Sequence, residues 1–437
     1  MHFYPKAGLR GKSFHDLGGR KSRSAVIKTV GVTGLLLNIL FLGLFAYVFG
    51  AIFQQNSHVH NFNVLFVDYD GGLIGASFRQ AYQQLQSSSF PTIIEEPASQ
   101  HPQPAMLDLA VCRTQYWAAL YISPNATARL VSALSGGSAT SSYNRSDIVT
   151  MIWNEARYPT TVDLIANDLG TLSASARIIY SEQNGTTAIQ SMDSTDPAAV
   201  AVFSNPWKLT SINLQPTSQG SRLIYNTIIV ILVLLQQYFF LATMNGVASK
   251  FQLFSRVHPK QVLFRRLAIS IIYTLGGSLC AAGTIWAFRS DWPVNGNQWV
   301  LTWLSLWLFA HSSFLTFDVF AIWVPPPFVP MALVTWVVLS VGSTLLPFEL
   351  TPTFYKWSYM LPAHALYELL VDIWSGGCNP HLAYALPVLF AYEISSGILS
   401  MIGVYRRSHY AVITEEQEEK RFQEKVAREI STHGSHR

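Results

Sequence analysis

The chain has 437 residues, of which 12% are charged and half are hydrophobic. Because soluble proteins carry roughly 25% charged residues, this composition indicates a membrane protein. The formal net charge is only +4, but 19 of the 29 Lys and Arg residues fall in three short stretches: before residue 29, from 250 to 266, and after 405. These stretches flank apolar runs instead of forming a basic folded face, so we expect the lipid bilayer as a partner and no nucleic acid.

Six apolar runs are long enough to cross a bilayer as helices. The first, 29–53, is longer than the core of a cleaved signal peptide and predicts a retained signal-anchor. Trp and Tyr lie at several of the ends, as expected at the membrane–water interface. The other five runs, which form a predicted membrane domain over 223–405, are Leu223–Val247, Leu267–Phe288, Trp299–Val324, Phe328–Leu346 and Ala383–Val404.

The distribution of basic residues predicts the orientation of these spans. The tail 1–28 has seven basic residues and one acid, so the positive-inside rule places it in the cytoplasm. Six crossings return the charged tail 406–437 to the same side. The loop 250–266 after the second span also falls on the cytoplasmic side, where its basic residues are expected. Glycosylation acceptors provide an independent indication, because all three lie between the first two spans, on the predicted outside: Asn125, Asn144 and Asn184.

Residues 54–222, between the first two spans, are predicted to form an extracytoplasmic α/β domain. Short apolar runs bounded by turn residues predict strands at 63–70, 91–96, 116–122 and 148–154. Helical patterns cover 76–85, 106–113 and 160–182, and a further helix begins after Asn125, which we expect to cap it. Four carboxylates near strand ends could act in acid–base chemistry, but solvated turn residues explain them equally simply: Asp68, Asp70, Glu95 and Glu96.

Motifs for catalysis or nucleotide hydrolysis do not emerge from the sequence. Gly11-Lys12-Ser13 lacks the earlier glycine of a phosphate-binding loop, since position 6 is Lys6, and no apolar strand precedes it. No metal-binding spacing occurs. We therefore expect neither a cofactor nor a metal, and no enzymatic activity. An oxidising compartment would allow a disulfide between Cys112 and Cys378, the alternative being two free thiols.

Ionisable residues inside predicted spans are costly and point to function by default. His311 and Asp318 are seven residues apart, close to two helical turns, and so share one face of their span. Glu393 lies in the last span. These three residues could line a polar path, bind a lipid headgroup or relay protons. Alternatively, they could hold helices together through interhelical hydrogen bonds.

The segment 347–380, before the last span, is rich in aromatic residues and broken by prolines. Its apolar pieces are too short to cross the bilayer, so we expect short helices in the outer leaflet. The charge-rich tail from Glu415 to Ile430 favours a solvated helix or a partner-binding segment.

The order of these elements resembles the ABC-2-type membrane domain and, within it, the fungal nitrosoguanidine-resistance membrane proteins. The matching stretches are FELTPTFYKWSYMLP and DIWSGGC within Phe348–Cys378, NPWKLTSINLQP at Asn205–Pro216, and YWAALYISPNAT at Tyr116–Thr127. The resemblance implies six helices, one plus five, with a large outer domain after the first. It also suggests a homodimer around a two-fold interface, and it brings no ATPase and no catalytic residues.

We therefore expect a plasma-membrane, transporter-like protein that exports, or confers resistance to, toxic or amphipathic small molecules. Membrane lipid organisation is one route to such resistance. The alternative is a non-transporting scaffold or regulator of lipid organisation, and a membrane-bound enzyme is a third, weaker option. The candidate path residues are His311, Asp318 and Glu393, and the candidate outer-gate residues are Tyr355, Trp357, Pro362 and His364.

Overall fold

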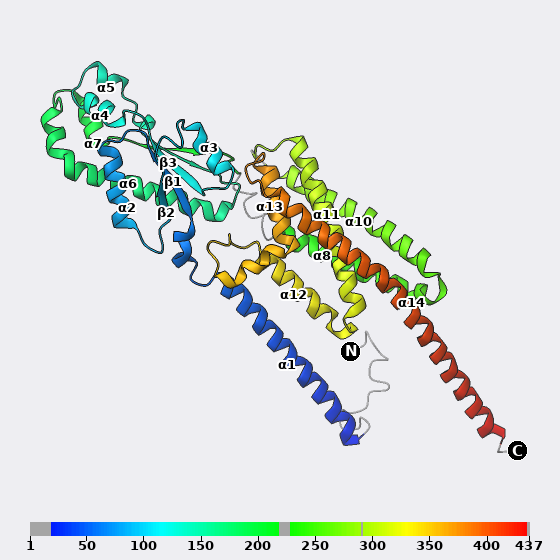
Figure 1. Ribbon diagram of the computed structural model, residues 1–437. Coiled ribbons are helices and arrows are strands. Elements are labelled where there is room, and N and C mark those ends of the chain that lie inside the picture. The colour runs from blue at the N-terminus through cyan, green and yellow to red at the C-terminus, as the bar shows by residue number, and fades with distance from the viewer. Residues whose placement is uncertain (1–18, 218–227, 290–291, 435–437) are drawn as a thin grey trace, which may run out of the picture.

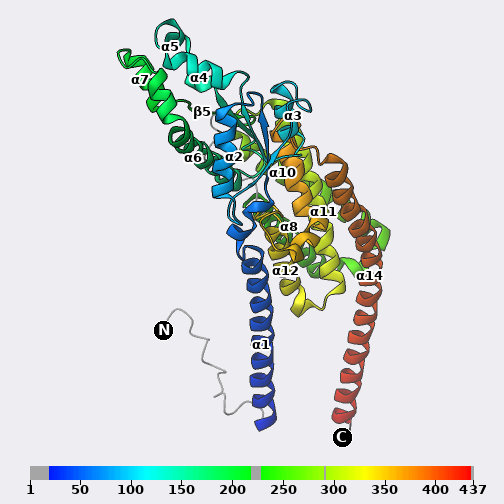
Figure 2. The same cartoon turned by 60° about the vertical axis from the view of Figure 1, so that its left-hand side comes forward.

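A computed structural model describes residues 19–217, 228–289 and 292–434 (Figure 1). An α/β domain occupies one end of the molecule, and long helices extend from it to the other end. The first of these, α1 (Gly19–Ala51), leads into the α/β domain through a short 3-10 helix, Gln55–Asn61. In both views the N-terminal end of α1 and the C-terminal end of α14 (Leu382–Gly434) lie far from the sheet, at the same end of the molecule (Figure 2).

The described residues of the α/β domain form a five-stranded sheet of order β2-β1-β3-β4-β5. Only β3 and β4 pair antiparallel, with Ala118 opposite Trp153, whereas the other neighbours are parallel. The strands are β1 (Asn63–Asp68), β2 (Thr92–Glu95), β3 (Ala118–Ile122), β4 (Val149–Trp153) and β5 (Leu209–Asn213).

The first four strands coincide with those predicted from the sequence, because each is a short buried apolar run. The fifth, β5, was not predicted, since its sequence LTSIN is polar and half-exposed and pairs at the edge of the sheet. The helices of the domain are α2 (Leu73–Leu85), α3 (Ala105–Cys112), α4 (Ala126–Leu134), α5 (Ser138–Ser142), α6 (Pro159–Ser191) and α7 (Pro197–Ser204).

The two faces of the sheet bury alternate residues of each strand, as strand geometry requires. On β1, Val64 and Phe66 join the core beneath α2 and α6, whereas Leu65 and Val67 pack against α3. The domain is therefore a sheet covered by helices on both faces. Asn125 precedes α4 as predicted but makes no side-chain capping hydrogen bond, because its backbone adopts a left-handed conformation, with φ 57°.

Five helices are long and apolar enough to cross a membrane, among the residues that the structure describes. The buried centre of the bundle is α11, which packs against its neighbours α8, α10, α13 and α14, while α1 packs mainly against α12. The span-length segments are Ile27–Ala51 in α1, Ile229–Lys250 (α8), Pro259–Ala287 (α10), Gly296–Trp323 (α11) and Leu382–Ala427 in α14.

The fifth predicted span, 328–346, is shorter in the structure than expected. Its helix α12 (Val329–Gly342) has 14 residues, because a proline-rich 3-10 turn precedes it and the helix ends where Ser343 and Thr344 follow. The N-terminal tail as far as residue 18, residues 218–222 and the first five residues of the predicted second span lie outside the described residues.

The remaining elements lie at the two ends of the bundle. The tail that follows the last span continues α14 as one helix, so the predicted boundary at residue 405 is not a structural break. The short helix α9 (Leu253–Arg256) follows α8. At the end nearer the sheet, a 3-10 helix (Thr353–Met360) precedes α13 (Pro362–Trp374).

Candidate functional site

The three ionisable residues predicted inside the membrane lie close together, between α10, α11 and α14. His311 and Asp318 share the buried face of α11. The Nδ1 atom of His311 lies 2.6 Å from the Oε1 atom of Glu393 on α14. Its Nε2 atom lies 3.2 Å from the Oγ atom of Ser270 on α10. This pair therefore joins three helices in the middle of the bundle.

Asp318 is the centre of a second polar group, which we call the Asp318 cluster: Asp318, Arg266, Arg407, Ser400 and Asn245. The carboxylate accepts hydrogen bonds from Arg266 (2.8 Å), Arg407 (3.2 Å) and Ser400 (2.5 Å). Both arginines also donate to the Asn245 side chain, each at 3.2 Å. The cluster thus ties α8, α10, α11 and α14 together.

The sequence did not assign the two arginines to this site. Arg266 directly precedes a predicted span and Arg407 follows one, so both were counted as cytoplasmic flanking charges. In the structure the helices α10 and α14 extend past those boundaries, which leaves Arg266 only 8% exposed. A buried carboxylate needs a buried counter-charge, and this requirement was the available signal, because these arginines flank the helices that face Asp318.

Three cavities lie in series along these polar residues. The largest, here the outer cavity, has a volume of about 900 Å³ and is lined by His311 and Glu393 among others. A middle cavity of about 310 Å³ shares His311 and Glu393 and reaches Arg266 and Asp318. A third cavity of about 770 Å³ begins at Asn245 and Arg407, on the other side of the Asp318 cluster. The two polar groups therefore separate successive cavities.

The outer cavity is mainly apolar and opens on the side of the bundle. Several of its lining side chains are exposed on the apolar surface between α11 and α14, so the opening faces the region where lipid would lie: Leu301, Leu304, Leu382 and Phe390. Its polar lining consists of Gln298, Ser305 and Asp372 in addition to His311 and Glu393. None of the described residues that line it is Lys or Arg.

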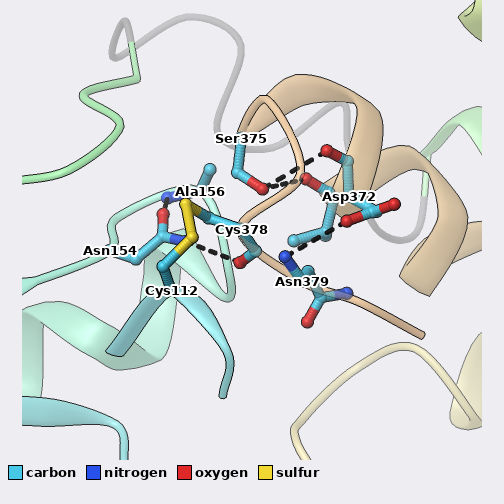
Figure 3. Close-up of a disulfide and its surroundings, with 8 residues drawn as sticks. Cys112, Asn154, Ala156, Asp372, Ser375, Cys378 and Asn379 are labelled. Atoms are coloured by element: carbon cyan, nitrogen blue, oxygen red, sulfur yellow. Dashed lines mark hydrogen bonds between the residues drawn. A yellow bond between two sulfur atoms is a disulfide. The ribbon is translucent and has the colours of Figure 1, made fainter. Parts of the chain in front are cut away.

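A loop after α13 forms part of the lining of the outer cavity and connects it to the α/β domain (Figure 3). Gly376 and Gly377 line the cavity and have φ of 66° and 96°, a conformation that glycine adopts without strain. The next residue, Cys378, forms a disulfide with Cys112 at the end of α3. Its carbonyl accepts a hydrogen bond of 3.1 Å from Asn154. The pairing that the sequence left open is therefore formed, and it fastens the cavity loop to the sheet.

Helix α13 makes further contacts between the α/β domain and the bundle. Burial would raise the pKa of Glu368, but His381, His364 and Asn379 outweigh it and lower that pKa to about 2. The Tyr367 hydroxyl donates to the Arg157 carbonyl at 3.1 Å. This hydrogen bond joins α13 to the α/β domain, and the lowered pKa of the neighbouring Glu368 keeps that side chain ionised beside the junction.

The predicted outer-gate residues lie elsewhere, and none of the four is among the residues that line the outer cavity. The rings of Tyr355 and Trp357 lie 5.2 and 6.1 Å from the ring of Tyr47 on α1. Pro362 begins α13, and the Nδ1 atom of His364 lies 3.0 Å from the Ser343 carbonyl oxygen. They fasten α1, α12 and α13 together, so the structure gives them a packing position and not a place at the mouth of the cavity.

Side chains singled out in the α/β domain have structural partners. Asp68 accepts from the backbone N–H groups of Asp70 and Gly71 and pairs with Arg79 at 2.7 Å. The acceptor asparagines Asn125 and Asn144 are exposed, and Asn184 is half-buried. Glycosylation at these three positions stays a prediction.

The fold and the polar bundle define a multi-pass membrane protein. The family model described as "Protein of unknown function (DUF3533)" matches residues 33–398, so the chain belongs to that family. It is also similar to a Saccharomyces cerevisiae protein described as an uncharacterized endoplasmic reticulum membrane protein. The two are 20% identical over 444 residues, which cover 92% of this chain and 84% of the relative. No solved structure matches the chain.

Proposed function

We propose that this protein takes up amphipathic small molecules from the bilayer into the outer cavity and releases them on the side of the α/β domain, away from the cytoplasm. The observation that carries the proposal is the apolar outer cavity, which reaches the His311–Glu393 pair and shares these two residues with the middle cavity. The apolar walls and lateral opening of the outer cavity suit a ligand that is dissolved in lipid. Export of toxic compounds would then confer resistance, and no catalysed reaction is assigned to the chain.

The proposal includes an orientation and a location. The α/β domain would lie on the outside or luminal side, with both tails in the cytoplasm, as the basic flanks favour. The expected plasma membrane and the endoplasmic reticulum named for the yeast relative are topologically equivalent, so the same path operates in either. The single membrane-length helix before the inserted α/β domain and the four that follow it, with the shorter helix α12, support an ABC-2-type organisation. In such an organisation the exposed apolar face of α1 would be available for a homodimer.

Cellular accumulation of labelled amphipathic compounds tests transport. Cells that lack the protein should accumulate more compound than cells that overproduce it. A cavity-filling variant, Leu308→Trp, should behave like the deletion at normal protein levels, because the indole occupies the outer cavity. The exposed position Glu416 offers a control, Glu416→Gln. Equal accumulation in deleted and overproducing cells would refute the proposal.

A second candidate, a membrane scaffold that organises lipids, is favoured by one observation. Helix α14 continues without interruption from the bundle into an exposed, charge-rich segment that a partner could bind. Truncation after residue 414 separates the two functions. The scaffold loses activity when the tail is removed and tolerates Leu308→Trp, whereas the transporter shows the opposite pattern.

A further inference from the structure

The hydrogen bonds around His311 determine where its protons lie. The hydroxyl of Ser270 donates to the Leu267 carbonyl at 2.8 Å, so it can only accept from the Nε2 atom of His311. The other ring nitrogen, Nδ1, faces the Oε1 atom of Glu393 at 2.6 Å. A lone pair on each atom at that distance would repel, so one proton must lie between them. The pair therefore holds a shared proton and is neutral as a whole.

A second state of the same pair requires only a rotation of the Ser270 hydroxyl. If that hydroxyl donates to Nε2, then Nδ1 carries the ring proton and donates it to an ionised Glu393 carboxylate. The pair then has one proton fewer and a charge of −1. The Oε2 atom of Glu393 is buried and has no hydrogen-bond partner among the described residues, and the Glu393 side chain as a whole is 23% exposed and lines the outer cavity.

The charges along the path favour a cation in the outer cavity. The titratable groups that line this cavity are His311 on α11, Asp372 on α13 and Glu393 on α14. In the middle cavity, Arg266 on α10 and Asp318 on α11 face the same pair. The Asp318 cluster sums to +1, because two arginines surround one carboxylate. A cation is thus attracted to the outer cavity and repelled from the Asp318 cluster beyond it.

We propose that the outer cavity binds a lipophilic monocation in exchange for one proton of the His311–Glu393 pair. This inference rests on the proposed function and names the class of its substrate. The bond between Nε2 of His311 and its proton breaks as the Ser270 hydroxyl turns to donate to Nε2. The proton leaves to water past Gly376 and Gly377, which line the cavity and are exposed at its end nearer the α/β domain, and the cation pairs with the Glu393 carboxylate. The charge of the cavity is unchanged by the exchange, which avoids the cost of an uncompensated charge in an apolar site.

The test uses two probes of matched size and opposite charge, tetraphenylphosphonium and tetraphenylborate. They are titrated into the purified full chain in nanodiscs of neutral lipid, with empty nanodiscs as background. Saturable binding of the phosphonium, with little binding of the borate, is expected. Its affinity should rise by up to tenfold per pH unit, and close to one proton should be released per cation bound. Glu393→Gln should weaken binding at least tenfold and abolish both the pH dependence and the proton release, whereas Glu416→Gln should leave all three unchanged.

Other outcomes overturn the exchange in distinguishable ways. Equal or tighter borate binding refutes the cationic class, and phosphonium binding that is independent of pH refutes the proton exchange. In either case, loss of probe binding in Leu308→Trp would leave the proposed cavity function intact. Binding of neither probe also overturns the inference. The cellular accumulation measurement then decides separately whether the proposed function stands. Thermal unfolding of each variant confirms that a loss of binding is not a loss of folding.

Discussion

Replacement of Asp318 with asparagine tests the Asp318 cluster. The variant Asp318→Asn keeps the size of the side chain and a partner for Ser400, but it removes the carboxylate that accepts from both Arg266 and Arg407. Two guanidinium groups then face one another inside the bundle, and their shared acceptors are neutral amide oxygens such as that of Asn245. Loss of one partner from a buried ion pair costs about 3–5 kcal/mol. At roughly 2–4 °C per kcal/mol, the melting temperature should fall by about 6–20 °C.

The assay is thermal unfolding of the purified chain in lipid nanodiscs. A triple variant provides the internal control: Arg266→Met, Asp318→Leu and Arg407→Met together. Because this variant leaves no buried charge in the cluster, it should be more stable than Asp318→Asn alone. If Asp318→Asn unfolds within about 1 °C of the wild type, the cluster does not hold the four helices together and the reasoning fails.

Three further predictions concern the α/β domain and its link to the bundle. Without reductant, the denatured protein should react with one maleimide, at Cys280, and with three after reduction; three at the outset would contradict the disulfide. Burial raises the pKa of Asp168 from 3.8 to about 6, because the folded protein favours the protonated carboxyl. The contribution of this carboxyl to folding stability is therefore fully present below pH ~4 and is lost as the pH rises through 6 and the buried group ionises. Asp168→Asn should therefore raise the melting temperature at pH 7.5 and leave it unchanged at pH 4, and an equal effect at both values would contradict the assignment. Replacement of the three acceptor asparagines, Asn125, Asn144 and Asn184, with glutamine should abolish a gel shift that deglycosidase treatment removes. If such a shift were mapped to either tail instead, the orientation would be reversed.

Much of the architecture could be predicted because it depends on local patterns. Apolar length identified the long spans, and alternating buried residues identified strands such as β1 and β3. The edge strand β5 was missed because a half-exposed strand lacks a continuous apolar run. Helix α12 was overestimated because apolar composition alone does not locate the end of a helix.

The candidate site could be predicted only in part, for a different physical reason. The cost of burying a charge marked His311, Asp318 and Glu393 as one group of interest, and the structure brings them together. Their partners come from distant segments, since Arg407 lies 89 residues from Asp318. Such a contact depends on how helices pack, which no local pattern encodes. For the same reason, the sequence did not indicate that Tyr355, a predicted gate residue, packs against α1.

Transport is tested most directly by the passage of labelled amphipathic compounds across the membranes of proteoliposomes that contain the purified full chain. Passage should be faster than through protein-free liposomes of the same lipid, and it should return to the protein-free rate in Leu308→Trp. Neutral and charged compounds are compared in the same assay, so the result does not depend on the cationic class. Rates equal to those of protein-free liposomes for every compound would contradict a transport path through these cavities.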